Sequence, residues 1–374
     1  MTETGFMRLL QALQRGPVMT EISPLALLCL PPEIDIASDA ETLVERLDIL
    51  EPHSERPILI PCIDTRYRHR FQVLNESLTY TPEAANEMLP RRLADARRLL
   101  LTHQRVAERI VSDTIQRGYC VVALLLVDGL SYEDARHWPE APEPCLIDGP
   151  SITYNLTDQD EIVPTVGFPG IVGAPTLARR LVDVGVPHST GFSYWRRERN
   201  EVSAYLFEGV PLTRVAGITT ALETLEQQSL EGTYVQLVRE GLDGLAHSRR
   251  EVTPREIEAA VEAIHDNYRR LIEVVAATEL PGVVYLTADH GILWKAQHPD
   301  LRLVEELHSA HPRYQRGGGA LSDYGVELSL TGQMYTLYRY PYLGATIHAN
   351  DSGVHGGLSY WESLVPFVRV EVNV

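Results

Sequence analysis

Continuous apolar runs alternate with amphipathic segments over most of the chain. Val121–Val127, Tyr234–Val238 and Val283–Thr287 are apolar almost throughout, which is typical of strands buried on both faces of a parallel sheet. Thr253 precedes a segment whose apolar residues recur every three or four positions, and Glu256 completes a capping box, so a long helix begins there. This alternation predicts an α/β fold with a mostly parallel sheet and helices on both faces.

Weaker patterns predict the remaining elements between residue 91 and the C-terminus. Ser131 and Asp134 resemble a capping box that starts another helix. Apolar residues with a helical period predict helices at Arg91–Gln116, Ala174–Val184, Ile218–Gln228 and Ser359–Leu364. Shorter apolar stretches predict strands at Val202–Phe207 and Phe367–Val372.

Two parts of the chain depart from this alternation. Residues 1–90 predict a small N-terminal α/β unit, with strands at Leu25–Leu30 and Pro57–Ile63 around a helix near Ala40–Leu50. Within the second domain, residues 91–374, the stretch from about 308 to 345 holds three consecutive glycines and three aromatic strand-like patches. We interpret it as an insertion that forms a rim or cap over a cleft. Its arginines, Arg313, Arg316 and Arg339, favour a polar surface of this insertion.

Composition and charge narrow the class of protein. Of the 374 residues, 44% are hydrophobic and 22% are charged, as in soluble globular proteins. The formal net charge of -18 repels nucleic acid and anionic membranes at long range, so a protein that coats DNA is excluded. No window reaches the roughly 18 apolar residues of a membrane span. The N-terminus mixes acids and bases without the apolar core of a signal peptide, which favours the cytoplasm.

Acidic and imidazole side chains follow three of the predicted buried strands. Sites in open α/β sheets form just beyond the carboxyl ends of the strands, so these side chains are expected to meet. Each motif alone is common in caps and loops, but together they supply three carboxylates and three imidazoles. The candidate ligands are Asp128, Asp243, His247, Asp289, His290 and His355.

This ligand set predicts a site for two divalent metal ions. Oxygen and imidazole ligands without thiolates suit Zn or Mn. Two ions about 3.5–4 Å apart can bind both the attacking and the leaving oxygen of a phosphoester displacement. Six ligands divide into three for each ion, which leaves positions for a substrate. The chemistry predicted from the residues is therefore a metal-dependent phosphohydrolase.

Three segments resemble a known family. VVALLLVDGLSYED, VVYLTADHG and HGGLSYWESLVPFVRVEV look like the PglZ domain, a branch of the alkaline-phosphatase superfamily, over about residues 118–374. The resemblance implies an alkaline-phosphatase-like fold, in which Asp128, Asp289 and His290 hold one metal. The second metal would be held by Asp243, His247 and His355. It further implies phosphodiesterase activity on a substrate such as a nucleotide or oligonucleotide, and protein partners in a bacterial anti-phage defence system.

The nucleophile departs from the family pattern. Related enzymes carry Thr or Ser within a segment like P-[ST]-x-T-x-P, and this chain has PTVGFP, with Gly167 at the expected position. Three alternatives stay open: Thr165 attacks from two residues earlier, a hydroxide held by the metals attacks directly, or the site turns over poorly. The competing hypothesis is therefore a component with little or no activity that binds metal or phosphoester and docks to partners. The sequence does not predict the oligomeric state.

Overall fold

The computed structural model of the protein describes residues 100–147, 167–194, 200–248, 250–307, 311–317, 323–330, 333–344 and 351–374, together with Asn86. The predicted N-terminal unit, residues 1–90, lies outside the described residues apart from Asn86. Thr165 also lies outside them. All six candidate metal ligands are among the described residues.

An eight-stranded sheet forms the centre of the described fold, in the order β1-β3-β15-β7-β2-β6-β4-β5. Its strands are β1 (Leu101–Thr102), β2 (Val121–Asp128), β3 (Glu143–Leu146), β4 (His188–Ser193), β5 (Leu212–Arg214), β6 (Thr233–Glu240), β7 (Gly282–Ala288) and β15 (Leu364–Val372).

Parallel pairing dominates this sheet, as the apolar runs predict. β2 pairs in parallel with β6 and with β7, while β4 pairs in parallel with β5 and β6. β15 runs antiparallel to both of its neighbours, β3 and β7. Every residue of β2 and of β7 is buried, which explains why both sequences lack polar alternation.

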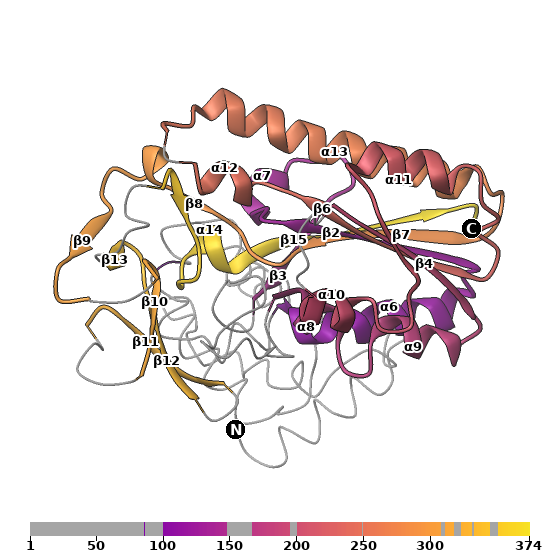
Figure 1. The fold of residues 1–374 in the computed structure, drawn as a ribbon, viewed down its shortest axis with the longest axis horizontal. Coiled ribbons are helices and arrows are strands. Elements are labelled where there is room, and N and C mark those ends of the chain that lie inside the picture. Colours follow the sequence, from indigo (N-terminus) through magenta and orange to yellow (C-terminus); the bar gives the residue numbers. More distant parts are fainter. Residues whose placement is uncertain are drawn as a thin grey trace, which may run out of the picture. The chain divides into compact units, whose positions relative to one another are not determined.

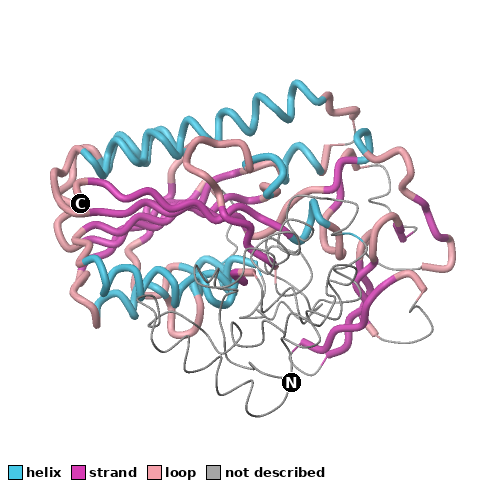
Figure 2. The backbone as a smooth tube through the Cα atoms, turned by 180° about the vertical axis from the view of Figure 1, so that it is seen from behind, coloured by secondary structure: helices cyan, strands magenta, loops and turns pink. Residues whose placement is uncertain are grey.

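Helices cover both faces of the sheet, so the predicted fold class is confirmed (Figures 1 and 2). One face carries α11 and α13, and the other carries α6, α8, α9 and α10 (Figure 1). The described helices are α6 (His103–Arg117), α7 (Tyr132–Ala135), α8 (Gly167–Val172), α9 (Leu177–Val182), α10 (Asn200–Leu206), α11 (Ile218–Leu225), α12 (Asp243–Ala246), α13 (Pro254–Ala276), α14 (Tyr360–Ser363) and the 3₁₀ helix η3 (Lys295–Gln297).

The long helix α13 begins where the sequence predicts. The Thr253 side chain accepts a hydrogen bond from the Glu256 backbone N–H, and the Glu256 side chain accepts one from the Thr253 backbone, so the capping box is complete. Pro254 occupies the first turn, where its missing N–H costs nothing. The buried side chains of α13 recur at helical spacing and include Ile257, Ile264 and Leu271.

Two predicted elements need correction. Residues 202–207, predicted as a strand, lie in and just after the helix α10. Ser203, Leu206 and Phe207 are buried, and their spacing of three and four follows the helical period. The six-residue segment is too short for this period to be recognised from the sequence. The helix predicted at Arg91–Gln116 is observed as α6 from His103 to Arg117, and Leu101 and Thr102 form the short strand β1 instead. Residues 91–99 lie outside the described residues.

Small sheets follow β7 in the chain. β8 (Leu293–Trp294) pairs with β14 (Gly353–Val354), and β9 (Arg302–Val304) pairs with β13 (Tyr342–Gly344). β10 (Tyr314–Arg316), β12 (Gln333–Tyr338) and β11 (Gly325–Leu330) form a three-stranded antiparallel sheet. Arg313, predicted to lie on a polar surface, is instead fully buried. None of the described helices is long and apolar enough to span a membrane.

Candidate metal centre

Three adjacent strands carry the candidate ligands to one edge of the sheet. β2 ends at Asp128, and its neighbour β7 leads directly into Asp289 and His290. On the other side of β2, β6 ends at Glu240 and is followed by the short helix α12, which starts with Asp243. Because parallel strands end at the same edge, side chains from three distant parts of the sequence meet there.

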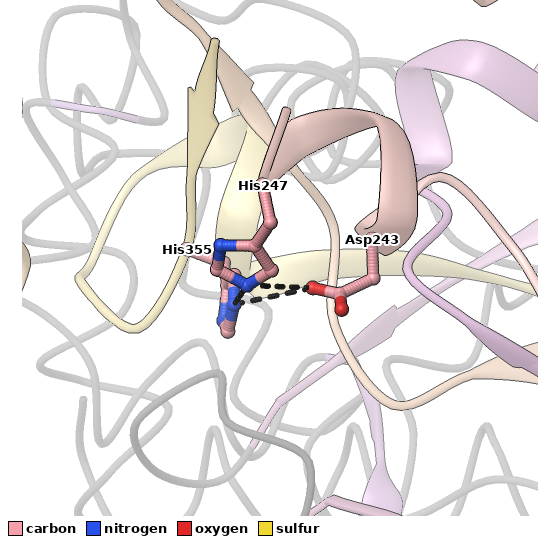
Figure 3. Close-up of side chains that lie close together, drawn as sticks. All are labelled: Asp243, His247 and His355. Carbon is pink, nitrogen blue, oxygen red and sulfur yellow. Dashed lines mark hydrogen bonds and ion pairs between the residues drawn. The ribbon is translucent and has the colours of Figure 1, made fainter. Parts of the chain in front are cut away.

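A compact group forms around Asp243 (Figure 3). Asp243 Oδ1 lies 3.3 Å from His247 Nε2 and 3.3 Å from His355 Nε2. The two Nε2 atoms lie 3.4 Å apart. Asp243 and His247 occupy one helical turn. His355 directly follows β14, which pairs with β8 just beyond His290. The three ligand atoms therefore come from two segments more than a hundred residues apart.

A second, wider group forms around His290. Its Nε2 lies 3.7 Å from Asp128 Oδ1, 3.8 Å from Asp243 Oδ1 and 3.8 Å from Asp289 Oδ2. The side chains of His290 and Asp289 are completely buried. The His290 and His355 rings stack with their centroids 4.0 Å apart, so the two groups are immediate neighbours. Asp243 Oδ1 is common to both groups.

The spacing of the compact group suits a shell of ligands around a cation. For bonds of about 2.0–2.1 Å, the edges of a regular tetrahedron of ligand atoms are about 3.3–3.4 Å long. The compact group has edges of 3.3, 3.3 and 3.4 Å. In the wider group, the distances from His290 Nε2 to the three carboxylate oxygens are longer than these edges, at 3.7, 3.8 and 3.8 Å.

Hydrogen bonds orient two of the imidazoles toward these groups. His247 Nδ1 lies 2.9 Å from Asp351 Oδ2, and the Asp351 side chain is almost completely buried. His290 Nδ1 lies 3.2 Å from the carbonyl oxygen of Gly291. Both partners are acceptors, so a ring bound to a cation would donate from Nδ1 and present Nε2 to the neighbouring ligand atoms. Such outer partners fix the ring orientation of metal-binding histidines.

The close approach of the motifs depends on Gly129. Its φ is 84°, and an added Cβ would lie 3.0 Å from the Asp243 backbone nitrogen and 3.3 Å from His290 Cε1. The Gly129 N–H donates to Asp289 Oδ1 over 3.1 Å, and the Gly129 carbonyl accepts from Leu242. The Asp-Gly pair that ends β2 thus ties the strand ends together.

The electrostatics of the compact and the wider ligand group favour the binding of a positive charge. Burial, together with Asp128, raises the pKa of Asp289 well above its ordinary value. Burial also opposes ionisation of Asp243, but His247 and His355 outweigh it and hold its pKa below the usual range. Asp243 in turn raises the pKa of His247 to about 9. Burial lowers the pKa of His290 to about 3, which keeps this imidazole in its neutral, ligating form.

A carboxylate oxygen without a donor points to the same conclusion. Asp289 Oδ2 is buried and accepts no hydrogen bond from the described residues, although Asp289 Oδ1 accepts from the Gly129 and His290 backbones. A buried carboxylate oxygen is costly unless it is paired or coordinates a metal. The donor set of oxygen and imidazole atoms therefore fits divalent cations such as Zn or Mn.

The structure brings all six sequence-predicted ligands into one place, but it divides them differently from the prediction. Asp243, His247 and His355 form one group as predicted. The other group comprises Asp128, His290 and Asp243 itself, with Asp289 adjacent, so one carboxylate is shared. That these residues bind metal remains a prediction. Thr165 lies outside the described residues, and Gly167 is the first residue of α8.

Sequence reasoning missed three side chains at the site. Asp351 contacts His247, and the Tyr194 hydroxyl donates to Asp128 Oδ2. The His311 ring lies edge-on to His355 with centroids 5.5 Å apart, and it stacks on Tyr314. None of the three stands in a recognisable motif. Only the position of Tyr194, directly after the strand β4, places it at the functional edge of the sheet.

Comparison with known proteins finds solved structures with a similar fold. No family model and no curated protein matches the sequence. Among solved structures, murine ectonucleotide pyrophosphatase/phosphodiesterase 5 is similar with a TM-score of 0.45 and 10% identity, covering 66% of this chain and 87% of its own.

Two further solved structures are less similar. A mutant of TAB5 alkaline phosphatase with Mg bound has a TM-score of 0.32 and 8% identity, covering 67% of this chain and 91% of its own. The C-terminal periplasmic domain of EptC from Escherichia coli, in complex with Zn, has a TM-score of 0.29 and 11% identity, covering 47% and 65%.

Proposed function

We propose that the protein is a metal-dependent phosphohydrolase that binds two divalent cations, Zn or Mn, at the edge of its sheet. The observation that carries the proposal is the pair of adjoining ligand groups that share Asp243. In this assignment His247 and His355 complete one cation site. Asp128, Asp289 and His290 complete the other. Bound there, two divalent cations would polarise a phosphoester and neutralise the charge that develops in its displacement.

Two divalent cations would offset the negative charge that Asp128, Asp243 and Asp289 place at the strand ends. They would also reverse the local field of a chain whose formal net charge is -18, so that an anionic phosphoester could approach. The preference for a diester over a monoester comes from the resemblance to the PglZ family.

The chain's own side chains hold this arrangement in place. Asp351 orients the ring of His247, and the Gly291 carbonyl orients the ring of His290. The Tyr194 hydroxyl fixes one oxygen of Asp128 and leaves Oδ1 directed at His290. Preorganised ligands of this kind bind a cation without first losing conformational freedom.

Thr165 is the proposed nucleophile, and water is the alternative, because Gly167 carries no hydroxyl. The resemblance to the PglZ family extends the proposal to nucleotide or oligonucleotide diesters and to partners from an anti-phage defence system. We also propose that the protein acts in the cytoplasm. The same glycine supports the competing function, a metal- or phosphoester-binding component with little turnover that docks to such partners.

A direct assay tests these proposals. We expect purified protein loaded with Zn or Mn to cleave a chromogenic phosphodiester faster than the corresponding monoester, and a chelator to abolish the activity. Asp289→Ala should remove the activity, because the wider group loses a ligand. Retained activity in Thr165→Ala would assign the attack to water. Tight binding of two cations without turnover would favour the non-catalytic function, and absence of cation binding would refute both.

A further inference from the structure

Arg313 and Glu362 form a buried ion pair next to the candidate metal centre. Both side chains are fully buried. Arg313 Nε donates to Glu362 Oε1 over 2.9 Å, and Nη2 donates to Oε2 over 2.7 Å, which is a bidentate pairing. Arg313 Nη1 donates to the carbonyl oxygen of Tyr342. Burying two charges costs desolvation energy that their attraction only partly offsets, so net stability is a weak reason for such a pair.

Glu362 also holds the two glycine motifs that follow the candidate ligands. Its Oε1 accepts from the Gly357 N–H over 3.0 Å, and its Oε2 accepts from Ser359 Oγ over 2.5 Å. Its backbone carbonyl accepts from the Gly291 N–H over 3.0 Å. Gly357 comes two residues after His355, and Gly291 directly follows His290. One glutamate therefore contacts the loops of both imidazoles.

The guanidinium packs tightly against the loop that carries His355. A Cβ added to Gly357 would lie 2.7 Å from Arg313 Nε and 2.6 Å from the carbonyl oxygen of Tyr338. Only a glycine admits Arg313 at this distance. The plane of the guanidinium thus fixes the backbone two residues beyond a candidate ligand, where a small displacement would move the imidazole out of reach of Asp243.

The same arginine connects residues 311–317 and 333–344 to this loop. Its carbonyl accepts from Tyr338, whose own carbonyl accepts from Leu358. Two residues before Arg313, the His311 ring lies against His355 with centroids 5.5 Å apart. The predicted insertion therefore contacts the candidate metal centre through backbone hydrogen bonds, through the buried charge of Arg313 and through the ring of His311.

We propose that the Arg313–Glu362 pair is a positioning clamp for His355, through which residues 311–317 and 333–344 set the cation affinity of the compact group. This inference rests on the proposed metal function. The clamp maintains the 3.3 Å distance between His355 Nε2 and Asp243 Oδ1. In this account Arg313 acts only through His355, because its three donor nitrogens are all engaged by Glu362 and Tyr342.

Cation titration of the Arg313→Lys variant tests the clamp. Lysine keeps the charge but loses the bidentate fork. We expect cation binding at the compact group to weaken by about 10–100-fold, the range for loss of an outer partner of a ligand, with the wider group unchanged. Absorption spectra of the Co²⁺-loaded protein report the two groups separately when His355→Ala provides the spectrum of the wider group alone.

Arg369→Lys is the matched control. Arg369 pairs with Asp113 over 3.2 Å and with Glu371, on the closing strand β15. It should leave both affinities at their wild-type values. If Arg313→Lys fails to fold, Ser359→Ala serves instead, because it removes the two hydrogen bonds between Ser359 Oγ and Glu362, one to Oε2 and one from the backbone N–H, and leaves the ion pair. This variant should weaken the compact group alone, by a smaller factor.

The outcomes separate the clamp from the proposed function. A folded Arg313→Lys or Ser359→Ala variant that binds two cations with wild-type affinities and an unchanged Co²⁺ spectrum would overturn the clamp and leave the proposed function standing. Equal weakening at both groups, or the same loss in Arg369→Lys, would also overturn it, because the effect would then be general. If the wild-type protein binds no cation, the proposed function itself fails.

Discussion

The two ligand groups differ in how the fold holds them. The wider group stands on strand ends, and the side chains of His290 and Asp289 have no exposed surface. In the compact group, the His247 side chain is 42% exposed, and His355 depends on loop contacts made by Glu362. The sheet backbone positions the first group, while side chains from later segments position the second. We therefore expect the wider group to bind its cation rigidly and the compact group to exchange its cation more readily.

Replacing the shared carboxylate should have the largest effect. Asp243→Ala removes the oxygen common to both groups, so we expect the variant to lose both cations. Loss of an outer partner of a ligand lowers activity by about 10–100-fold, and the cation-dependent activity of Asp243→Ala should fall further than that. Elemental analysis of the purified variant gives the number of cations per chain. Asp266→Ala on the exposed side of α13 is the control, and two retained cations in Asp243→Ala would break the shared-ligand arrangement.

Removing one imidazole from each group should separate the two. His355→Ala should lose the cation of the compact group and retain the other, since no atom of the wider group changes. His290→Ala should do the reverse, and with a larger loss of stability because this side chain is completely buried. Cation stoichiometry and thermal unfolding of both variants check this. Loss of both cations in either single variant would show that the groups do not bind independently.

The central sheet and its long helix were predictable from the sequence because their patterns are long. Every residue of β2 is buried, and α13 repeats its apolar period over 23 residues from a complete capping box. The segment of residues 202–207 was predicted wrongly as a strand, because six residues fit both the helical and the strand period. Tertiary packing decides between the two. There, Ser203, Leu206 and Phe207 turn to the core together.

The candidate site was predictable to the extent that it consists of ligands at strand ends. The residues that orient these ligands were not. Asp351 reaches His247 across 104 positions, and nothing in its neighbourhood differs from an ordinary polar loop. Arg313 has the sequence context of a surface arginine, yet it is buried because Glu362 supplies a bidentate partner 49 positions later. Such pairings are set by tertiary contacts, which a local pattern does not contain.

The outer partner of His247 should have an intermediate effect. Asp351→Ala leaves every ligand in place but frees the ring, so the cation affinity of the compact group should fall by about 10–100-fold. Asp351→Asn retains an acceptor for Nδ1 and should fall less. The wider group should be unaffected in both. Isothermal titration with Zn or Mn measures this, and an unchanged affinity in Asp351→Ala would show that the 2.9 Å contact does not orient the ligand.

A change far from both groups should have the smallest effect and should be confined to stability. Thr253→Ala removes the N-cap of α13 and should cost about 1 kcal/mol of unfolding free energy. Because α13 packs on the sheet rather than on the ligands, both cation affinities should stay unchanged. Denaturant unfolding together with the same titration tests this. A lowered cation affinity would mean that the sheet transmits the change to its edge.

Anomalous diffraction from crystals grown with Zn or Mn would locate the cations. We expect two cation peaks, one bonded to Nε2 of His355 and of His247, the other bonded to Nε2 of His290 and to Asp128, with Asp243 as a ligand of both. A single peak, or cations bound away from these side chains, would contradict this arrangement.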